Sequence, residues 1–346
     1  MLYLLAISTR VRFPASDAFA SKPSPTGAMR LPPCCMYAIP LAWLLAVTAC
    51  SGTGEPARRD TTHPQARADS LPAPTPFVES SAPATPLGAS VLRGLALVEH
   101  TRDSLPSYVG GNLRCTSCHL DRGSRPNAAP LNGVYARFPK YLDRTDAVIT
   151  VEDRVNYCFT RSLGGRALPV RSREMVDIVA YLAFIGRTAG AGGHVRGEGM
   201  AKMPALTGDS ARGEELFAST CARCHGMDGA GVAAVPAVWG AKSFTIGASM
   251  ARVERAASFV RHNMPLDKPG TLNDRQAYDV AAYIDSHARP DSPGKHDDWP
   301  AGGAPADVPY ATKGHVPARV QAVLPRARTD GAIVPAPVRA GGALDR

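Results

Sequence analysis

The sequence predicts a mostly α-helical protein that contains two small helical domains in tandem. A C-x-x-C-H motif occurs twice, at residues 115–119 and 221–225, so that the copies lie 106 residues apart. Each copy is followed by a polar loop, a middle helix and a late amphipathic helix, which indicates an internal repeat. No segment sustains the alternation of polar and apolar residues that is typical of a β-strand.

The helices of both halves follow from capping signals and apolar spacing. In the first half, Thr150 and Asp153 have capping-box spacing and open a middle helix within residues 149–163. A late helix over 172–186 carries its apolar residues on one face, at Met175, Ile178, Val179, Leu182 and Ile185. In the second half, residues 249–265 predict the middle helix. Residues 273–287 predict the late one, which opens with Asn273 and Gln276.

Composition sets the expected domain boundaries. We expect the first domain over 88–188, a Gly- and Ala-rich linker over 189–206, and the second domain over 207–290. Residues 51–87 hold seven prolines among small polar residues and predict an extended linker. Residues 291–346 hold eight prolines and seven glycines, and predict a tail that is disordered or draped over the surface.

Residues 1–50 have the pattern of a signal segment, whose true start we expect at Met29. The apolar run over residues 36–49 is short for a transmembrane helix and suits a secretory signal. It ends in Val-Thr-Ala-Cys, which resembles a bacterial lipobox with Cys50 as the lipidated residue. We therefore expect a periplasmic protein that is lipid-anchored to a membrane. The alternative is an ordinary signal peptide in which Cys50 is incidental.

The charge and the aromatic content narrow the class of protein further. Lys and Arg outnumber Asp and Glu by 39 to 30, which gives a net charge of +9 and favours anionic partners. No nucleic-acid-binding motif accompanies this charge, so we expect no nucleic acid partner. Only 6% of the residues are aromatic, while 32 are glycine and 31 proline. Such a chain builds a thin core, so either much of it is linker or another group fills the core.

The repeated motif is the attachment signature of a c-type haem. Its two thiols bind the two vinyl groups of a porphyrin, and its histidine ligates the iron. The predicted attachment residues are Cys115, Cys118 and His119 in the first half, and Cys221, Cys224 and His225 in the second. A zinc site would need a second ligand pair close by, and a redox dithiol would not need the histidine twice. The sequence therefore predicts two covalently bound c-type haems in two cytochrome c-like domains.

The repeat also predicts where each iron finds a sixth ligand. Met264 lies 39 residues after His225, in a loop before Pro265, and Met with His is a common pair in electron-transfer haems. The same offset from His119 reaches Cys158, where the first half has no methionine. A thiolate at that position lowers the potential of a haem.

The helix around Cys158 adds charged neighbours. Arg154, Cys158 and Arg161 fall on one face at helical spacing, and Ser162 borders that face. Guanidinium groups beside a cysteine favour its thiolate and bind oxyanions through bidentate contacts. The alternative is a buried thiol between two solvated arginines, because cysteine is often buried.

At this point the chain resembles a known family, the dihaem c-type thiosulfate dehydrogenases. The resemblance covers residues 105–290 and includes "NLRCTSCHLDRGSRPNAAPLNGVYARFPKY", "ITVEDRVNYCFTRSLGGRALP" and "FVRHNMPL". It implies coupling of two thiosulfates into tetrathionate, with release of two electrons. It also implies the following ligand and substrate residues: His119 and Cys158 on the active-site haem, His225 and Met264 on the exit haem, and Arg144, Arg154 and Ser162 on the substrate.

From this resemblance we expect Cys158 to act as a covalent centre, with a soluble cytochrome c or similar protein as electron acceptor. Three alternatives stay open at this stage. The same site could run mainly as a tetrathionate reductase. The protein could be a non-enzymatic dihaem electron carrier. It could also be a thiosulfate-handling haem subunit of a sulfur-oxidising multienzyme system.

Overall fold

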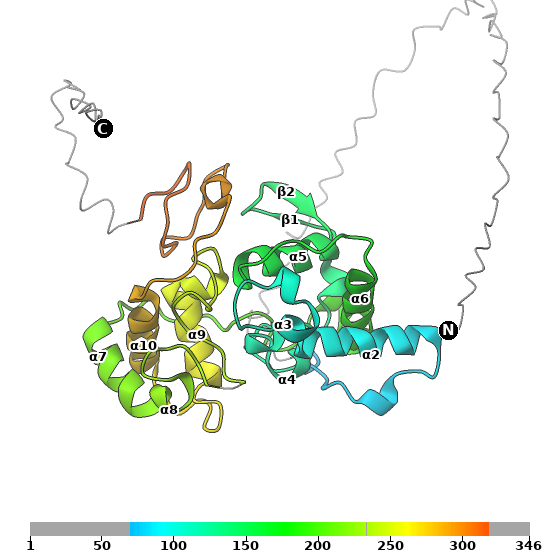
Figure 1. Cartoon of the computed structure of the whole chain (residues 1–346), viewed down its shortest axis with the longest axis horizontal. Coiled ribbons are helices and arrows are strands. Elements are labelled where there is room, and N and C mark those ends of the chain that lie inside the picture. The colour runs from blue at the N-terminus through cyan, green and yellow to red at the C-terminus, as the bar shows by residue number, and fades with distance from the viewer. Residues whose placement is uncertain (1–69, 233, 318–346) are drawn as a thin grey trace, which may run out of the picture. The chain divides into compact units, whose positions relative to one another are not determined.

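The computed structural model describes residues 70–232 and 234–317, all of which belong to one compact unit (Figure 1). The predicted signal segment and Cys50 lie outside these residues, so lipidation stays a prediction. None of the helices in the described part of the chain is both long and apolar enough to span a bilayer.

The described elements are mostly helical, as predicted. The first half contains α2 Pro86–Glu99, α3 Thr101–Ser104, α4 Leu120–Gly123, β1 Lys140–Leu142, β2 Ala147–Ile149, α5 Val151–Tyr157 and α6 Arg173–Ile185. The second contains α7 Ser210–Leu216, α8 Ala222–His225, α9 Val253–Asn263 and α10 Asp274–Ser286. Two π-helical turns follow α5 and α7, at Cys158–Ser162 and Phe217–Cys221. Short 3₁₀ turns lie at Glu79–Ser81, Pro106–Tyr108, Cys115–Ser117, Tyr135–Arg137, Gly186–Thr188, Ala191–Gly193, Ser249–Ala251 and Lys295–Asp297.

The predicted capping boxes are present. Thr150 Oγ1 accepts a hydrogen bond from the Asp153 amide at 3.2 Å, and the Asp153 carboxylate accepts one from the Thr150 amide at 2.9 Å. Asn273 and Gln276 make the same reciprocal pair, with both distances 2.9 Å. These bonds satisfy amides at the N-termini of α5 and α10 that have no partner within the helix.

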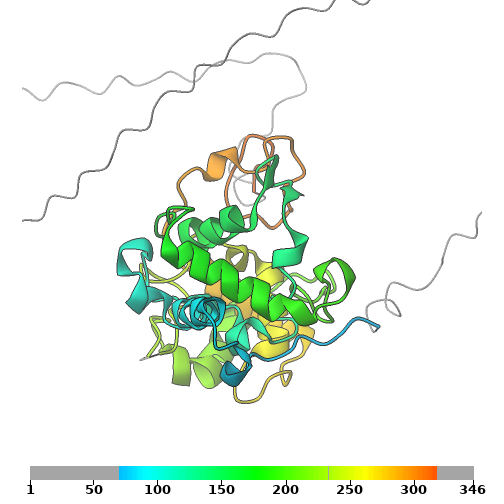
Figure 2. The same ribbon diagram turned by 90° about the vertical axis from the view of Figure 1, so that its right-hand side faces the viewer.

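Each half contains the same kind of helix crossing, in which a glycine of one helix lies against the backbone of another. This similarity confirms the internal repeat. A Cβ atom added to Gly94 in α2 would lie 2.0 Å from the carbonyl oxygen of Asp177 in α6. A Cβ atom added to Gly213 in α7 would lie 2.0 Å from the carbonyl oxygen of Asp279 in α10. Figure 2 looks along α2 and shows α6 running across it. Only glycine permits backbones to approach this closely.

A salt bridge between the two crossing helices stabilises each crossing. Arg93 Nε lies 2.7 Å from Asp177 Oδ2, and Arg212 Nε lies 2.8 Å from Asp279 Oδ2. Both carboxylates are only 5% exposed, which leaves each one dependent on its arginine partner. The arginine directly precedes the glycine in both halves, so one local pattern serves both crossings.

Each half has its own apolar core. The first is built around α5 and α6, with Phe159, Met175 and Ile178 fully buried. Phe244, Ala248 and Ala251, within the range predicted for the second domain, belong to this same cluster. The second core combines the π-turn residue Phe217 and Trp239 with residues of α9 and α10: Val260, Ala277, Val280, Ala281 and Ile284.

The N-terminal flank differs from its prediction as an extended linker up to residue 87. Phe77 is buried with its ring centre 5.4 Å from that of Tyr181. The carbonyl oxygen of Pro72 accepts a hydrogen bond from the Arg196 amide at 2.8 Å. The composition argument failed here because one buried aromatic ring outweighs the effect of several prolines.

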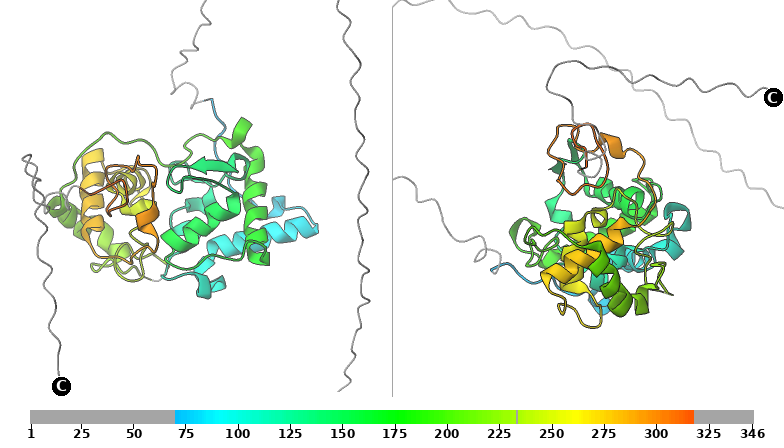
Figure 3. Two further views of the ribbon diagram at one scale, coloured as in Figure 1. Left: turned by 90° about the horizontal axis from the view of Figure 1, so that it is seen from above. Right: turned by 90° about the vertical axis from the view of Figure 1, so that its left-hand side faces the viewer.

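The C-terminal flank was predicted to be either disordered or draped over the surface, and its described part, residues 291–317, is ordered. Residues 291–317, which we call the C-terminal strap, fold against the first half (orange in Figures 1 and 3). Asp298, Trp299, Val308 and Tyr310 are all buried, the last three in a small apolar cluster. The Trp299 amide donates to the carbonyl oxygen of Arg144 at 2.9 Å. Two buried aromatic rings thus favour the draped alternative over disorder in this part of the tail.

Candidate haem sites and substrate site

The second motif lies on an apolar cavity of about 720 Å³, within the range of cofactor sites in proteins. Cys221, Cys224, His225 and Met264 all line this cavity. Its remaining surface is mainly apolar and includes Phe217, Val238, Phe259, Val260, Val280 and Ile284. An apolar cavity with two thiols, an imidazole and a thioether is the donor set that a c-type haem requires.

The backbone orients the histidine of this motif. His225 Nδ1 lies 3.1 Å from the carbonyl oxygen of Pro236, which leaves Nε2 as the nitrogen for an iron. Burial lowers the pKa of His225, so the ring is neutral, as a metal ligand must be. Met264 follows α9 directly, in the loop where the repeat predicts it. These residues fit a haem.

The first motif has the same histidine arrangement. His119 Nδ1 lies 2.6 Å from the carbonyl oxygen of Ala129. Burial raises the pKa of Cys115 to about 11 and that of Cys118 to about 12. The Cys115 amide donates to Thr101 Oγ1 at 3.0 Å, which holds the motif against the start of α3. None of the cysteines in the described residues forms a disulfide, so both motifs are available for attachment.

Cys158 begins the π-helical turn after α5, and its pKa is shifted in the opposite direction from those of Cys115 and Cys118. Arg154 Nη1 donates to its sulfur at 3.0 Å. Burial by itself would raise the pKa of Cys158, but the Arg154 guanidinium and the His119 imidazole outweigh burial and lower that pKa to about 6. The chain thus favours a thiolate facing the histidine of the first motif. The first donor set therefore also fits a haem.

The remaining predicted substrate residues surround this turn. Ser162 is its last residue and is half-buried. Arg161 is placed against Asp298 of the strap, with Nη1 to Oδ2 at 2.8 Å. Arg144, between β1 and β2, reaches the same carboxylate with Nε to Oδ2 at 3.1 Å. The structure brings Arg154 to the sulfur of Cys158, and brings Arg144 and Arg161 together on Asp298.

The position of Arg161 differs from the prediction that it shares one helix face with Arg154 and Cys158. That spacing applies to a continuous α-helix, whereas the helix becomes π-helical at Cys158 itself. Such turns re-aim side chains and are frequent at functional sites. Arg154 is accordingly the arginine that contacts the thiol, and Arg161 is held by the strap.

Sequence reasoning missed Asp298 and Tyr310, because both lie in the segment with disorder-like composition. The signal that could have revealed them is the pair of aromatic residues, Trp299 and Tyr310, in an otherwise Pro- and Gly-rich segment. The β1–β2 hairpin was missed too, since strands of three residues are too short to show alternation.

The two haem sites adjoin one another. The cavity of the second motif is also lined by Ser117, Cys118 and Leu120, which belong to or follow the first motif. Phe259 of α9 packs with Leu120 in one apolar cluster. Groups attached at the two motifs are therefore neighbours, as electron transfer between them requires.

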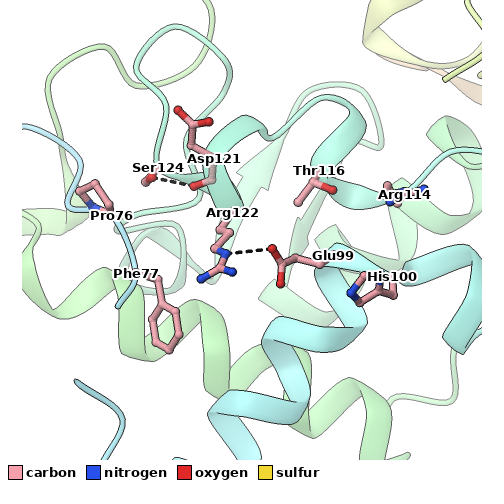
Figure 4. Close-up of a pocket in the computed structure, with 9 residues that line it drawn as sticks. All are labelled: Pro76, Phe77, Glu99, His100, Arg114, Thr116, Asp121, Arg122 and Ser124. Atoms are coloured by element: carbon pink, nitrogen blue, oxygen red, sulfur yellow. Dashed lines mark hydrogen bonds and ion pairs between the residues drawn. The ribbon is translucent and has the colours of Figure 1, made fainter. Parts of the chain in front are cut away.

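A second hollow of about 500 Å³ lies on another side of the first motif and includes Arg114 and Thr116 (Figure 4). Arg122 points across it toward Glu99, with Nε to Oε1 at 2.8 Å, and also pairs with Glu79 at 3.2 Å. We assign no substrate to the hollow, because Cys158 does not line it.

The fold and the donor sets define a protein of two cytochrome c domains that bind c-type haem. Residues 110–189 match the model of the SoxA/TsdA cytochrome c domain, and residues 208–284 match cytochrome C oxidase, cbb3-type, subunit III. The chain is 41% identical over 237 residues to a thiosulfate dehydrogenase of Psychrobacter arcticus, which covers 66% of the chain and 72% of that relative. The chain belongs to the thiosulfate dehydrogenase family, so the resemblance seen in the sequence is confirmed.

Two further relatives agree. A thiosulfate dehydrogenase of Allochromatium vinosum is 37% identical, over 73% of this chain and 93% of its own length. The solved structure of the thiosulfate dehydrogenase TsdBA from Marichromatium purpuratum superposes with a TM-score of 0.59 at 32% identity. That match covers 64% of this chain and 50% of the solved chain, so our chain spans half the length of that protein. The protein is a thiosulfate-oxidising cytochrome c enzyme.

Proposed function

We propose that this protein is a periplasmic dihaem enzyme that joins two thiosulfates into tetrathionate and passes two electrons to a soluble cytochrome c or similar acceptor. The observation that carries the proposal is the half-buried Cys158, whose thiolate is stabilised by Arg154 at 3.0 Å and which faces His119. A cysteine with a lowered pKa at a haem donor set is suited to covalent sulfur chemistry.

The ligand assignment follows the two donor sets. His119 and Cys158 would hold the haem attached at Cys115 and Cys118, and His225 and Met264 the haem attached at Cys221 and Cys224. When bound, the two haems supply a pair of one-electron acceptors. The adjoining sites support electron passage from the first haem to the second, and from there to the external acceptor.

The covalent step takes place on the sulfur of Cys158. Its thiolate forms an S–S bond with the outer sulfur of one thiosulfate, and two electrons leave, so that a singly charged S-thiosulfonate adduct remains. A second thiosulfate attacks that adduct, the S–S bond to Cys158 breaks, and tetrathionate departs with its two charges. The thiolate is restored, and Arg154 stabilises it as leaving group.

The charge of the site suits an anionic substrate. Thiosulfate is a dianion and must enter a site where water is partly excluded, which is unfavourable without cationic partners. Arg154 contacts the sulfur of Cys158, Arg161 lies in the same π-helical turn as Cys158 and Ser162, and Arg144 shares the carboxylate of Asp298 with Arg161. Planar guanidinium groups bind oxyanions by bidentate hydrogen bonds.

The deciding experiment compares the Cys158→Gly variant with the wild type in a thiosulfate-dependent haem reduction assay, with tetrathionate quantified as product. We expect turnover to be lost while both haems stay attached, as determined by haem content per chain. Near-normal tetrathionate formation by the variant would refute the covalent role of Cys158. Haem reduction without tetrathionate in the wild type would refute the proposed product.

We also propose that the mature chain is lipid-anchored through Cys50, on the basis of the lipobox-like Val-Thr-Ala-Cys. Mass spectrometry of the membrane fraction tests this directly. A mature protein without lipid on Cys50 would contradict it.

A further inference from the structure

We propose that Asp298 is a positioning residue of the substrate anion site, which holds Arg144 and Arg161 together as one preorganised cationic pair. The inference rests on the proposed function, which assigns these arginines to thiosulfate. It goes further by giving the C-terminal strap a role in substrate affinity.

The contacts of Asp298 carry the inference. Its side chain is only 2% exposed and accepts hydrogen bonds from Arg161 Nη1 at 2.8 Å, Arg144 Nε at 3.1 Å and Tyr310 Oη at 2.6 Å. Arg161 also donates through Nη2 to Oδ1, which makes that pair bidentate, and Arg144 Nη2 contacts Tyr310 Oη. One buried carboxylate thus joins two arginines that are 17 residues apart in the sequence.

Each guanidinium is also fixed by an aromatic ring. Arg144 lies 4.6 Å from the ring centre of Trp299, and Arg161 lies 4.8 Å from that of Tyr157. The arginine side chains stay 15% and 13% exposed. An aromatic face together with a carboxylate restricts the rotamers of an otherwise flexible side chain, so less entropy is lost when an anion binds.

The backbones of both arginines are anchored as well. The Trp299 amide donates to the carbonyl oxygen of Arg144 at 2.9 Å, and Thr245 Oγ1 donates to that of Arg161 at 2.5 Å. Arg161 lies in the same π-helical turn as Cys158, so its ion pair with Asp298 links the strap to the turn that carries the reactive sulfur.

The charges of the two arginines and Asp298 are consistent with a role of Asp298 in positioning the arginines. Two guanidinium groups and one carboxylate leave one net positive charge, to which Arg154 adds another. Without Asp298 the two guanidinium groups would repel each other at short range and separate. Burial raises the pKa of Tyr310 to about 12, so its hydroxyl stays protonated and continues to donate to Asp298.

The test is steady-state thiosulfate oxidation by the holoenzyme with Asp298→Asn, Tyr310→Phe and Asp307→Asn. Asp307 binds Arg252 at 2.7 Å elsewhere in the strap, so D307N serves as a matched control that does not touch the arginine pair. For D298N we expect the KM for thiosulfate to rise about tenfold, which is the loss of affinity typical of removing one charged hydrogen-bonding partner. We expect kcat to stay within about threefold of the wild-type value. Y310F should give a smaller rise, and D307N should keep the wild-type KM.

A folding defect would instead lower the amount of holoprotein and leave the KM of the remainder unchanged. Y310F keeps the aromatic ring, so it tests the idea even where D298N does not accumulate. The inference is overturned by a wild-type KM in both variants, or by a KM below the wild-type value, which would mean that Asp298 competes with the substrate. Cys158→Gly in the same series separates the proposed function from this inference. A fully active C158G would refute the proposed site at Cys158. An inactive C158G together with a wild-type KM in D298N would refute only the positioning role of Asp298.

Discussion

Arg154 Nη1 lies 3.0 Å from the sulfur of Cys158, one helical turn away. Among the described cysteines whose pKa departs from its usual value, Cys158 alone has a lowered pKa, whereas Cys115, Cys118 and Cys221 are raised by burial. Together with the neighbouring His119 imidazole, this contact distinguishes Cys158 from the cysteines of the attachment motifs.

Arg154→Gln removes the guanidinium and should lower thiosulfate turnover about 100-fold, the loss typical of one preorganised charge-stabilising donor. The reason is that the thiolate of Cys158 loses its cationic partner both as nucleophile and as leaving group. Initial rates with the purified holoenzyme check this, with Arg173→Gln, whose side chain is 72% exposed, as control. Rates within a few-fold of wild type would show that the contact is structural only.

Met264→Ala should leave the second haem attached but change its axial ligation. The absorption spectrum and the redox potential of that haem should shift, since a Met ligand raises the potential. Met227→Ala is the matched control, because Met227 lies close to the same motif and is 65% exposed. An unaltered spectrum in M264A, or an equal shift in M227A, would contradict the assignment of Met264.

Gly94→Ala should destabilise the first domain. The added Cβ would meet the carbonyl oxygen of Asp177 at 2.0 Å and the Tyr181 Cβ at 2.8 Å, so α2 and α6 must move apart. Overpacking of this kind costs about 1–3 kcal/mol. Urea denaturation measures it, with Leu92→Ala, at a 41% exposed position of the same helix, as control. Equal stability of G94A and wild type would show that the crossing tolerates a methyl group.

Asp177 should make stability depend on acid pH. Burial opposes its ionisation, but hydrogen bonds from Arg93 and Ser90 outweigh burial and lower its pKa below the usual 3.8. The folded state therefore binds the proton more weakly than the unfolded state, so this contribution is complete above about pH 4 and is lost as the pH falls further.

Asp177→Asn should accordingly lower the melting temperature at pH 7 and flatten its decline below about pH 4. Thermal unfolding between pH 7 and pH 3 measures both effects. Asp103→Asn, at an exposed position of α3, is the control. A D177N curve parallel to that of the wild type across this range would exclude the linkage.

Local patterns in the sequence determined much of this protein. The C-x-x-C-H motifs, the capping boxes at Thr150 and Asn273, and the helical faces each depend on residues within one or two turns of one another. The repeat then predicted Met264 at the end of α9 and pointed to Cys158, because both halves use the same chain path from histidine to loop.

Only the tertiary structure decided how the arginines are held. Asp298 lies 137 residues after Arg161 and 154 after Arg144, in a segment predicted to be disordered or draped over the surface. The π-helical turn at Cys158 likewise had no local pattern that predicted it. Contacts at such separations depend on how whole elements pack. A few buried groups, here Trp299, Tyr310 and one shared carboxylate, can order a segment against its average composition.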